Sequence, residues 1–234
     1  MNQDRFIEEL EKINIKINQQ QIQQLHRYYE LLIEWNQKIN LTGITQEDQV
    51  YLKHFFDSAT LYKAIQLENI ETLCDVGTGA GFPGIVLKIL FPHLKVTLVD
   101  SLNKRIQFLN LVIHELGLND ITAIHARAEE FAHNHIEQFD IVTARAVAPL
   151  NILVEYCLPM VEKNGYFIPM KANLNDEIEN SKHAIHLLNG KIDHLLEFTL
   201  PIENSHRSLL SIKKVSSSPT KYPRKYAEIK KRPL

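Results

Sequence analysis

The feature that most constrains the fold is a series of short apolar runs, separated by segments of helical periodicity, that begins near residue 72. The runs lie at residues 72–76, 95–100, 121–125, 139–143 and 165–170. Strand-length runs that alternate with helical segments are typical of repeated strand–helix units, whose strands are parallel. Two later runs, at residues 191–200 and 208–215, predict an antiparallel hairpin at the sheet edge. We therefore predict an α/β fold with a Rossmann-like, mainly parallel sheet.

The two ends of the chain differ from this alternation. Up to about residue 66, apolar residues recur at the spacing of helix faces, which predicts helices before any strand. The sequence Ser-Ser-Ser-Pro at residues 216–219 predicts a linker into a terminal segment rich in lysine and arginine. We expect three parts, which are a helical extension at residues 1–66, a core at residues 67–215 and a basic tail at residues 216–234.

Local signals predict several helix ends. Asn18 is the expected N-cap of the second helix, and Thr45 with Asp48 three residues later resembles a capping box that would begin a third. Gly117 and Gly165 stand where C-terminal caps would end two later helices. A polar cap side chain accepts hydrogen bonds from the backbone N–H groups that are free at a helix start, and a glycine allows the turn that satisfies the free carbonyls at a helix end.

The composition bounds the class of protein. A chain of 234 residues with 44% hydrophobic and 23% charged residues is typical of a globular protein with one substantial core. Cys74 and Cys157 lie far apart in apolar stretches, which suggests neither a disulfide framework nor a zinc pattern and favours a reducing, cytoplasmic location. The start of the chain does not have the pattern of a signal peptide, and no apolar run reaches about 18 residues, so we expect no membrane association. The histidines at 125, 133 and 135 lack the spacing of a recognised ligand set, so we expect no metal.

The first predicted strand ends in a glycine-rich loop that leads into an apolar helix. The loop has the spacing D-x-G-x-G-x-G from Asp75, with Gly77 and Gly79 as its first two glycines and Pro83 at the helix start. Glycines allow positive φ and let a ligand touch bare backbone. A dinucleotide fold places its third glycine one residue later, to seat a pyrophosphate on the helix N-terminus. This loop lacks that phosphate-binding spacing, and S-adenosylmethionine has no phosphate. We therefore predict that the loop binds S-adenosylmethionine, with Asp75, Gly77 and Gly79 at the cofactor site.

Residues at the ends of the next strands extend the predicted site. Asp100 ends the second strand, where a nucleoside-binding sheet holds the two ribose hydroxyls. The alternative is that Asp100 only caps the helix that follows. Ala128 follows the third strand and is small enough to let the backbone approach an adenine. For Phe82, a ring that packs the helix onto the sheet is the alternative to a cofactor contact.

Longer stretches of the chain resemble one bacterial family. They are Glu34-Trp35-Asn36, Asn40-Leu41-Thr42, His54-Phe55-Phe56-Asp57-Ser58, residues 75–84, residues 100–105, residues 127–130, Ala144-Arg145-Ala146 and Tyr222-Pro223-Arg224-Lys225. The combination of Gly81-Phe82-Pro83-Gly84 with the helical preamble and Ala144-Arg145-Ala146 is the most specific part. Over nearly its full length the chain resembles the glucose-inhibited division protein B family, which are small-subunit rRNA guanine-N7 methyltransferases.

The resemblance implies a class I S-adenosylmethionine-dependent methyltransferase that modifies N7 of guanine 527 in 16S rRNA. The cofactor-binding positions that it carries over are Gly77, Phe82, Ala128, Glu129 and Arg145. For Arg145 the alternative is a cation at a strand end, paired with a nearby acid. Asp75, Gly79 and Asp100 join this predicted site on the physical argument above.

The implied partner is 16S rRNA or the 30S subunit, and we expect Arg224 and Lys225 of the basic tail to contact RNA phosphates. The chain departs from the family pattern at residues 226–229, where most relatives have Pro-Gly and another proline, and at Ala172, where a glycine is usual. Whether free rRNA, an assembling particle or the finished subunit is the substrate stays open. The oligomeric state also stays open, with a monomer as the default.

The residues after the fourth strand argue against some methyl acceptors. Enzymes of this fold that methylate exocyclic amines carry an Asp/Asn/Ser-Pro-Pro-aromatic element there, whereas residues 144–150 are Ala-Arg-Ala-Val-Ala-Pro-Leu. Carbon-5 methylation needs a cysteine nucleophile, but Cys74 and Cys157 are expected in the core. Guanine N7 has an in-plane lone pair, so the transfer needs alignment, and we expect no catalytic side chain.

Two other functions compete with this interpretation. An RNA-binding assembly factor with a relic cofactor fold is disfavoured because the glycines of the loop and both strand-end aspartates are intact. A small-molecule methyltransferase is disfavoured by the basic tail, which such an enzyme does not need. Binding to rRNA that weakens steeply with salt would separate these classes.

Overall fold

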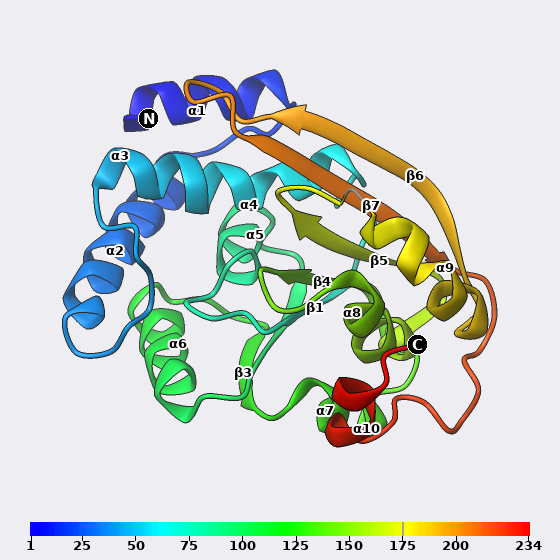
Figure 1. Ribbon diagram of the computed structural model, residues 1–234. Coiled ribbons are helices and arrows are strands. Elements are labelled where there is room, and N and C mark those ends of the chain that lie inside the picture. Colours follow the sequence, from blue (N-terminus) through cyan, green and yellow to red (C-terminus); the bar gives the residue numbers. More distant parts are fainter. Residues whose placement is uncertain (175) are drawn as a thin grey trace.

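A mixed sheet forms the centre of the protein, with helices on both faces (Figure 1). This computed structural model describes residues 1–174 and 176–234, and within them the sheet has seven strands in the order β3-β2-β1-β4-β5-β7-β6. The strands are β1 (Thr72–Val76), β2 (Lys95–Asp100), β3 (Ile121–His125), β4 (Phe139–Arg145), β5 (Val161–Lys171), β6 (Gly190–Thr199) and β7 (His206–Lys214). The five predicted strands and the predicted hairpin are therefore confirmed.

The strand directions create a crevice at one edge of the sheet. Strands β1 to β5 pair in parallel, whereas β7 pairs antiparallel with both β5 and β6. The chain moves from β1 outward to β3, and then returns to the other side of β1 for β4 and β5. In open α/β sheets, ligands bind at the carboxyl ends of the strands where the order reverses in this way. The reversal here lies between β1 and β4.

The two faces of the sheet belong to two separate apolar clusters. Leu73 of β1 packs in the first cluster, with α5 (Gly84–Leu90) and α6 (Asn103–Glu115), whereas its neighbour Cys74 packs in the second. The second cluster holds α7 (Ala128–Asn134), α8 (Leu150–Cys157) and α9 (Glu177–Leu187). Successive strand residues face opposite sides of a sheet, which explains the division. Cys74 and Cys157 are both fully buried, as predicted for core residues.

The N-terminal helices pack into the first cluster. They are α1 (Gln3–Lys12), α2 (Gln19–Asn36), α3 (Glu47–Val50), the π-helical turn η1 (Tyr51–Phe56), α4 (Asp57–Ala59) and the 3₁₀ turn η2 (Thr60–Lys63). Asn18 caps α2 in a reciprocal capping box with Gln21, so this prediction is confirmed. The predicted box of Thr45 and Asp48 is wrong. Gln46 is the N-cap of α3, which places Asp48 one residue too early for the reciprocal bond.

The two predicted glycine caps differ in outcome. Gly117 follows α6 with φ of +61°, the left-handed conformation of a helix C-terminus, and is confirmed. Gly165 does not cap a helix, because it lies inside β5. A Cβ atom there would lie 2.5 Å from the carbonyl oxygen of Asp140, so the close approach of β4 explains this glycine. Pro83 is the N-cap of α5, one residue before the expected position.

The C-terminal tail folds back onto the second cluster. It ends in the short helix α10 (Tyr226–Lys231), which lies beside α7 in Figure 1. Ile229 is fully buried and Tyr222 nearly so. Arg224 donates from its backbone N–H and its guanidinium to the carboxylate of Glu155, over distances of 2.6 to 2.9 Å. Among the described residues, no helix has the length and apolar character to cross a membrane.

The pairing with Glu155 gives Arg224 a structural role, and its predicted contact with RNA phosphates stays a prediction. Glu155 is fully buried, and a buried carboxylate is costly unless a cation and hydrogen bonds satisfy it. Arg224 meets that requirement from a position 69 residues away in the chain. Lys225 beside it is exposed and stays a predicted phosphate contact.

We predict that Arg224→Ala lowers the free energy of unfolding by about 3 kcal/mol, because it leaves the Glu155 carboxylate buried without its cation. Lys225→Ala is the matched control and should change stability by less than about 0.5 kcal/mol, since its side chain is exposed. Urea unfolding followed by circular dichroism measures both. Equal stability of Arg224→Ala and the unaltered protein would show that the tail is not anchored by this pair.

Candidate functional site

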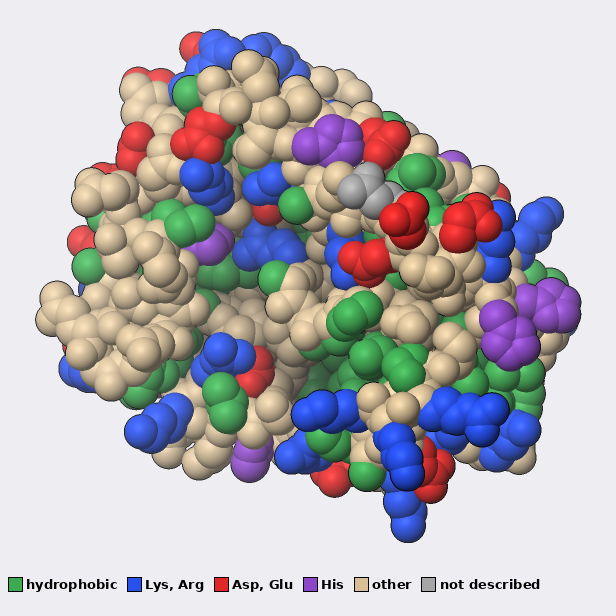
Figure 2. Space-filling model, in the orientation of Figure 1, with side chains coloured by type: hydrophobic (Ala, Val, Ile, Leu, Met, Phe, Trp, Pro, Cys, Tyr) green, Lys and Arg blue, Asp and Glu red, His purple; other side chains and the backbone are tan. Residues whose placement is uncertain are grey.

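Two cavities lie next to each other at the carboxyl ends of the parallel strands. The first, here called the glycine-loop cleft, has a volume of about 310 Å³, and its walls include Gly77, Asp100, Ala128, Glu129, Val147 and Tyr226. The second, here called the arginine cavity, has a volume of about 590 Å³, and its walls include Lys53, His54, Asp57, Arg145, Lys171 and Arg207. Figure 2 shows the face that is hollowed here, with lysine and arginine side chains gathered in the hollow and again over α10. Four of the predicted cofactor residues thus converge in one cleft.

Asp75 holds the glycine loop in place through hydrogen bonds to its buried carboxylate. Its side chain is fully buried, and one carboxylate oxygen accepts hydrogen bonds from the Thr78 hydroxyl at 2.7 Å and the Gly84 N–H at 2.8 Å. Burial raises the pKa of Asp75 to about 6, against the opposing effect of these two bonds. The other oxygen, Oδ1, is buried without a hydrogen-bond partner among the described residues. Asp75 therefore supports the loop, and its contact with a cofactor stays a prediction.

The first two glycine positions of the loop require glycine because of their backbone conformation. Gly77 has φ of +68° and Gly79 has φ of +62°, which side chains rarely adopt. A Cβ atom on Gly77 would also lie 2.5 Å from a methyl group of Val147. Tyr28 of α2 donates its hydroxyl to the carbonyl of Ala80, so a helix from the N-terminal part holds the loop from the other side. Sequence reasoning missed Tyr28, which carries no motif.

Asp100 lines the cleft and is 3% exposed. Its carboxylate accepts from the Gly79 N–H and the Leu102 N–H at 2.9 Å, and from the Arg105 guanidinium at 3.1 Å. Leu102 is the N-cap residue of α6, so the capping alternative is met in part. An ionised carboxylate has about four acceptor sites, which leaves capacity for a ligand hydroxyl. The ribose contact stays a prediction.

Glu129 places a second carboxylate at the cleft. It is 5% exposed and lines the cleft beside Ala128. Its carboxylate has no hydrogen bond or ion pair among the residues that the structure describes. A buried carboxylate without a partner is costly, so a donor on a bound molecule would stabilise it. Glu129 lies in the first turn of α7, the helix that follows β3, and its contact with an adenine stays a prediction.

Phe82 and Arg145 lie on the side of the arginine cavity instead. The Phe82 ring packs against the rings of His54 and Tyr28, at centroid distances of 4.5 and 5.4 Å. The Arg145 guanidinium lies 5.3 Å from the centroid of the same ring and pairs with Asp57 at 3.1 Å. The paired-cation alternative for Arg145 thus describes its contacts. The packing alternative describes Phe82, although its partners are N-terminal helices rather than the sheet. Cofactor contacts by these two residues stay predictions.

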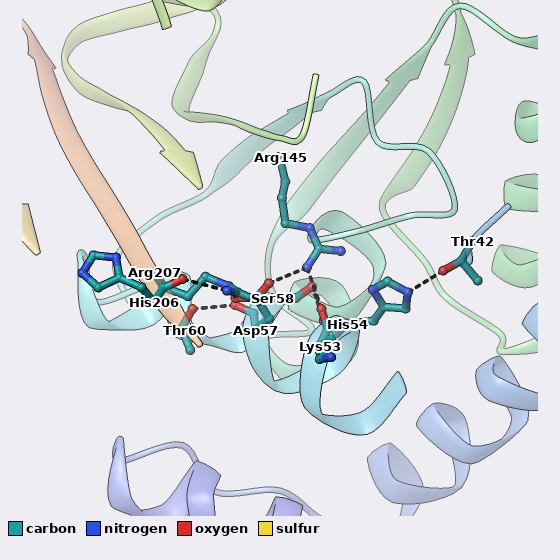
Figure 3. Close-up of polar contacts among 9 residues, drawn as sticks. All are labelled: Thr42, Lys53, His54, Asp57, Ser58, Thr60, Arg145, His206 and Arg207. Atoms are coloured by element: carbon teal, nitrogen blue, oxygen red, sulfur yellow. Dashed lines mark hydrogen bonds and ion pairs between the residues drawn. The ribbon is translucent and has the colours of Figure 1, made fainter. Parts of the chain in front are cut away.

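Asp57 is the centre of the arginine cavity (Figure 3). Its two oxygens accept from Arg145 of β4 at 3.1 Å and from Arg207 of β7 at 2.8 Å. Two arginines on one carboxylate leave the cluster with a net positive charge. Arg207 lies 150 residues from Asp57, so no sequence spacing signals this cluster.

His54 is held in the neutral form beside these cations. Its Nε2 is hydrogen bonded to the Thr42 hydroxyl at 2.8 Å. Burial, and then the charge of Arg145, lower the pKa of His54 to about 3. Both His54 and Asp57 come from the stretch that begins with η1, and single π-helical turns often occur at functional sites.

The comparison with known families agrees with this geometry. The family described as rRNA small subunit methyltransferase G matches residues 21–207. The chain belongs to this family. Proteins named ribosomal RNA small subunit methyltransferase G from Exiguobacterium sibiricum and Alkaliphilus metalliredigens are 48% and 51% identical to it. The first alignment covers 100% of both chains, and the second covers 96% of this chain and 95% of the relative.

Solved structures share the fold at low identity. A precorrin-6y C5,15-methyltransferase from Geobacter metallireducens matches 75% of this chain and 92% of its own, with a TM-score of 0.51 and 14% identity. An S-adenosylmethionine-dependent O-methyltransferase from Thermotoga maritima matches 80% and 72%, with a TM-score of 0.53 and 14% identity. The predicted class I methyltransferase fold is confirmed. Within residues 1–174 and 176–234, no group of three or more metal-ligating side chains is placed to hold an ion.

We predict that Asp75 makes stability fall as the pH rises from about 4 to 7. Its folded pKa of about 6 exceeds the ordinary value of 3.8, so the folded state binds the proton more tightly. The resulting stabilisation is full below pH 4, is lost as the pH passes through 6, and amounts to about 3 kcal/mol.

Asp75→Asn removes this ionisation, so its free energy of unfolding relative to the unaltered protein should rise over the same interval. Urea unfolding at several pH values measures the difference, with Asp4→Asn as an exposed control. Parallel curves for Asp75→Asn and the unaltered protein would contradict the assigned pKa.

Proposed function

We propose that this chain transfers a methyl group from S-adenosylmethionine to N7 of guanine 527 in 16S rRNA. The observation that supports it best is the adjacency of the two cavities. Arg145 and Ala146 line the arginine cavity, and the next two residues, Val147 and Ala148, line the glycine-loop cleft. A cofactor in the cleft therefore lies beside a cationic cavity that suits a nucleotide. The relatives named rRNA small subunit methyltransferase G support the same assignment.

The residues of the cleft fit the parts of the cofactor. The unpaired carboxylate of Glu129 suits the amine of an adenine, and the small side chain of Ala128 leaves room for its ring. Asp100 has acceptor capacity for a ribose hydroxyl, and the bare backbone of Gly77 admits the methionine portion. When bound, the cofactor supplies a methyl group on a sulfonium.

The arginine cavity suits a flipped-out guanine nucleotide. Its lining cations are Lys53, Arg145, Lys171 and Arg207. Their ion pairs with Glu203, Asp57 and Glu177 leave the group with a net positive charge that suits a phosphate, as expected for a protein that binds RNA backbone. Neutral guanine N7 has no proton to remove, so these residues need only hold the base in line with the methyl group. An exposed rRNA loop supplies unstacked bases at lower cost than a duplex does.

The basic surface over α10 supports rRNA or the 30S subunit as the partner. Lys225, Lys230 and Lys231 are exposed there (Figure 2). Phosphate contacts of this kind are sequence-independent and weaken steeply with salt. We propose that Lys225 is one of them, in a cytoplasmic protein.

The proposed function predicts site-specific labelling of the small subunit. Purified protein is incubated with radiolabelled S-adenosylmethionine and 30S subunits from a strain that lacks the methyltransferase. We expect one labelled guanine per subunit, which chemical cleavage at N7-methylguanine maps to position 527. Subunits from the parent strain are the control and should accept little label, because the position is already methylated. Label on a base amine, or transfer to small molecules alone, would refute the proposal.

The reaction should be almost independent of pH from about 7 to 9. When RNA and cofactor are saturating, the single-turnover rate depends on pH only if a catalytic group ionises. A transfer without a general base has no such group. His54, whose pKa is about 3, stays neutral throughout this range. His54→Gln should therefore leave the profile flat. A tenfold rise through one pKa that disappears in a variant with intact RNA and cofactor binding would reveal a general base.

A further inference from the structure

We propose that the C-terminal helix α10 forms part of the cofactor site, with the ring of Tyr226 packed on the adenine of the bound cofactor. The inference rests on the proposed use of S-adenosylmethionine and extends it to a segment that no motif marks. Tyr226 and Lys230 both line the glycine-loop cleft. They lie four residues apart in α10, so they face the same side of the helix.

The helix is fixed in place independently of any ligand. Ile229, on the neighbouring face of the helix, is fully buried in the second apolar cluster, which also holds residues of α7 and α8. Just before the helix, Arg224 is bound to the buried carboxylate of Glu155. These contacts hold the Tyr226 ring at the cleft before a ligand arrives, which reduces the entropy that binding would otherwise lose.

The Tyr226 ring lies at the end of the cleft where the adenine is expected. The Arg127 guanidinium lies 4.7 Å from its centroid, and the next residues, Ala128 and Glu129, line the cleft. Tyr226 is nevertheless 41% exposed, which is unusual for a large ring on an anchored helix. The other walls nearby include Ile152 and Ala148, which are apolar.

The chemistry of this end suits a flat nucleobase. An aromatic ring stacks on the π-face of a base, and the arrangement needs no phosphate or metal. Glu129 at the same end accepts from the exocyclic amine, so the ring and the carboxylate together select an adenosine. Lys230, whose ammonium lies 5.9 Å from the Tyr226 ring, covers the outer side of the cleft.

Titration calorimetry with S-adenosylmethionine and with adenosine alone tests the proposal in the full-length chain. Tyr226→Ala should weaken both ligands by roughly tenfold, whereas Tyr226→Phe should bind as the unaltered protein does. Lys231→Ala is the matched control on the same helix, because its side chain is exposed and lies outside the cleft. It should leave both affinities unchanged.

Hydrogen exchange of the unaltered protein provides a second measurement that needs no variant. The amides of residues 226–231 should exchange more slowly when S-adenosylmethionine saturates the protein. Unaltered exchange there, together with wild-type affinity of Tyr226→Ala, would overturn the role of α10 while leaving the proposed function intact. Failure of the unaltered protein to bind S-adenosylmethionine would instead refute the proposed function.

Discussion

The buried carboxylate of Asp75 is the interaction on which the site depends. By accepting from Thr78 and Gly84, it ties both ends of the glycine loop to strand β1. The positive φ angles of the loop cost nothing in glycine, but they leave the free loop with many conformations, so it needs such an anchor. Once the loop is fixed, the Gly79 N–H donates to the carboxylate of Asp100, and this hydrogen bond connects the loop after β1 to the end of β2.

Asp57 plays a comparable part for segments that are far apart in the chain. It lies in the N-terminal helices, whereas Arg145 ends β4 and Arg207 lies in the hairpin strand β7. A buried charge without its partner is costly in free energy, so these ion pairs hold the three segments together. The N-terminal helices are for this reason a structural part of the arginine cavity, in addition to sharing an apolar cluster with the sheet.

The sequence predicted those features that have a local cause. Strands follow from apolar runs, and Gly77, Asp100, Ala128 and Glu129 meet because the carboxyl ends of parallel strands share one edge. Gly165 was misinterpreted, and the pairing of Arg224 was missed, because their causes are tertiary. The first is fixed by the backbone of Asp140 and the second by the carboxylate of Glu155. The cluster of Asp57 with Arg207 and the place of Tyr226 in the cleft were missed for the same reason.

The charges of the two cavities affect how the positive charge is stabilised during the proposed methyl transfer. The cleft contains the carboxylates of Asp100 and Glu129, which suit a cationic cofactor, while the neighbouring cavity contains an excess of cations. Transfer to N7 moves the positive charge from sulfur to the purine, toward those cations. The carboxylate of Asp57 is already paired with Arg145 and Arg207, so it is not free to neutralise this charge. In the proposed reaction the phosphates of the RNA therefore balance the product charge, which makes the substrate backbone part of the electrostatics of its own methylation.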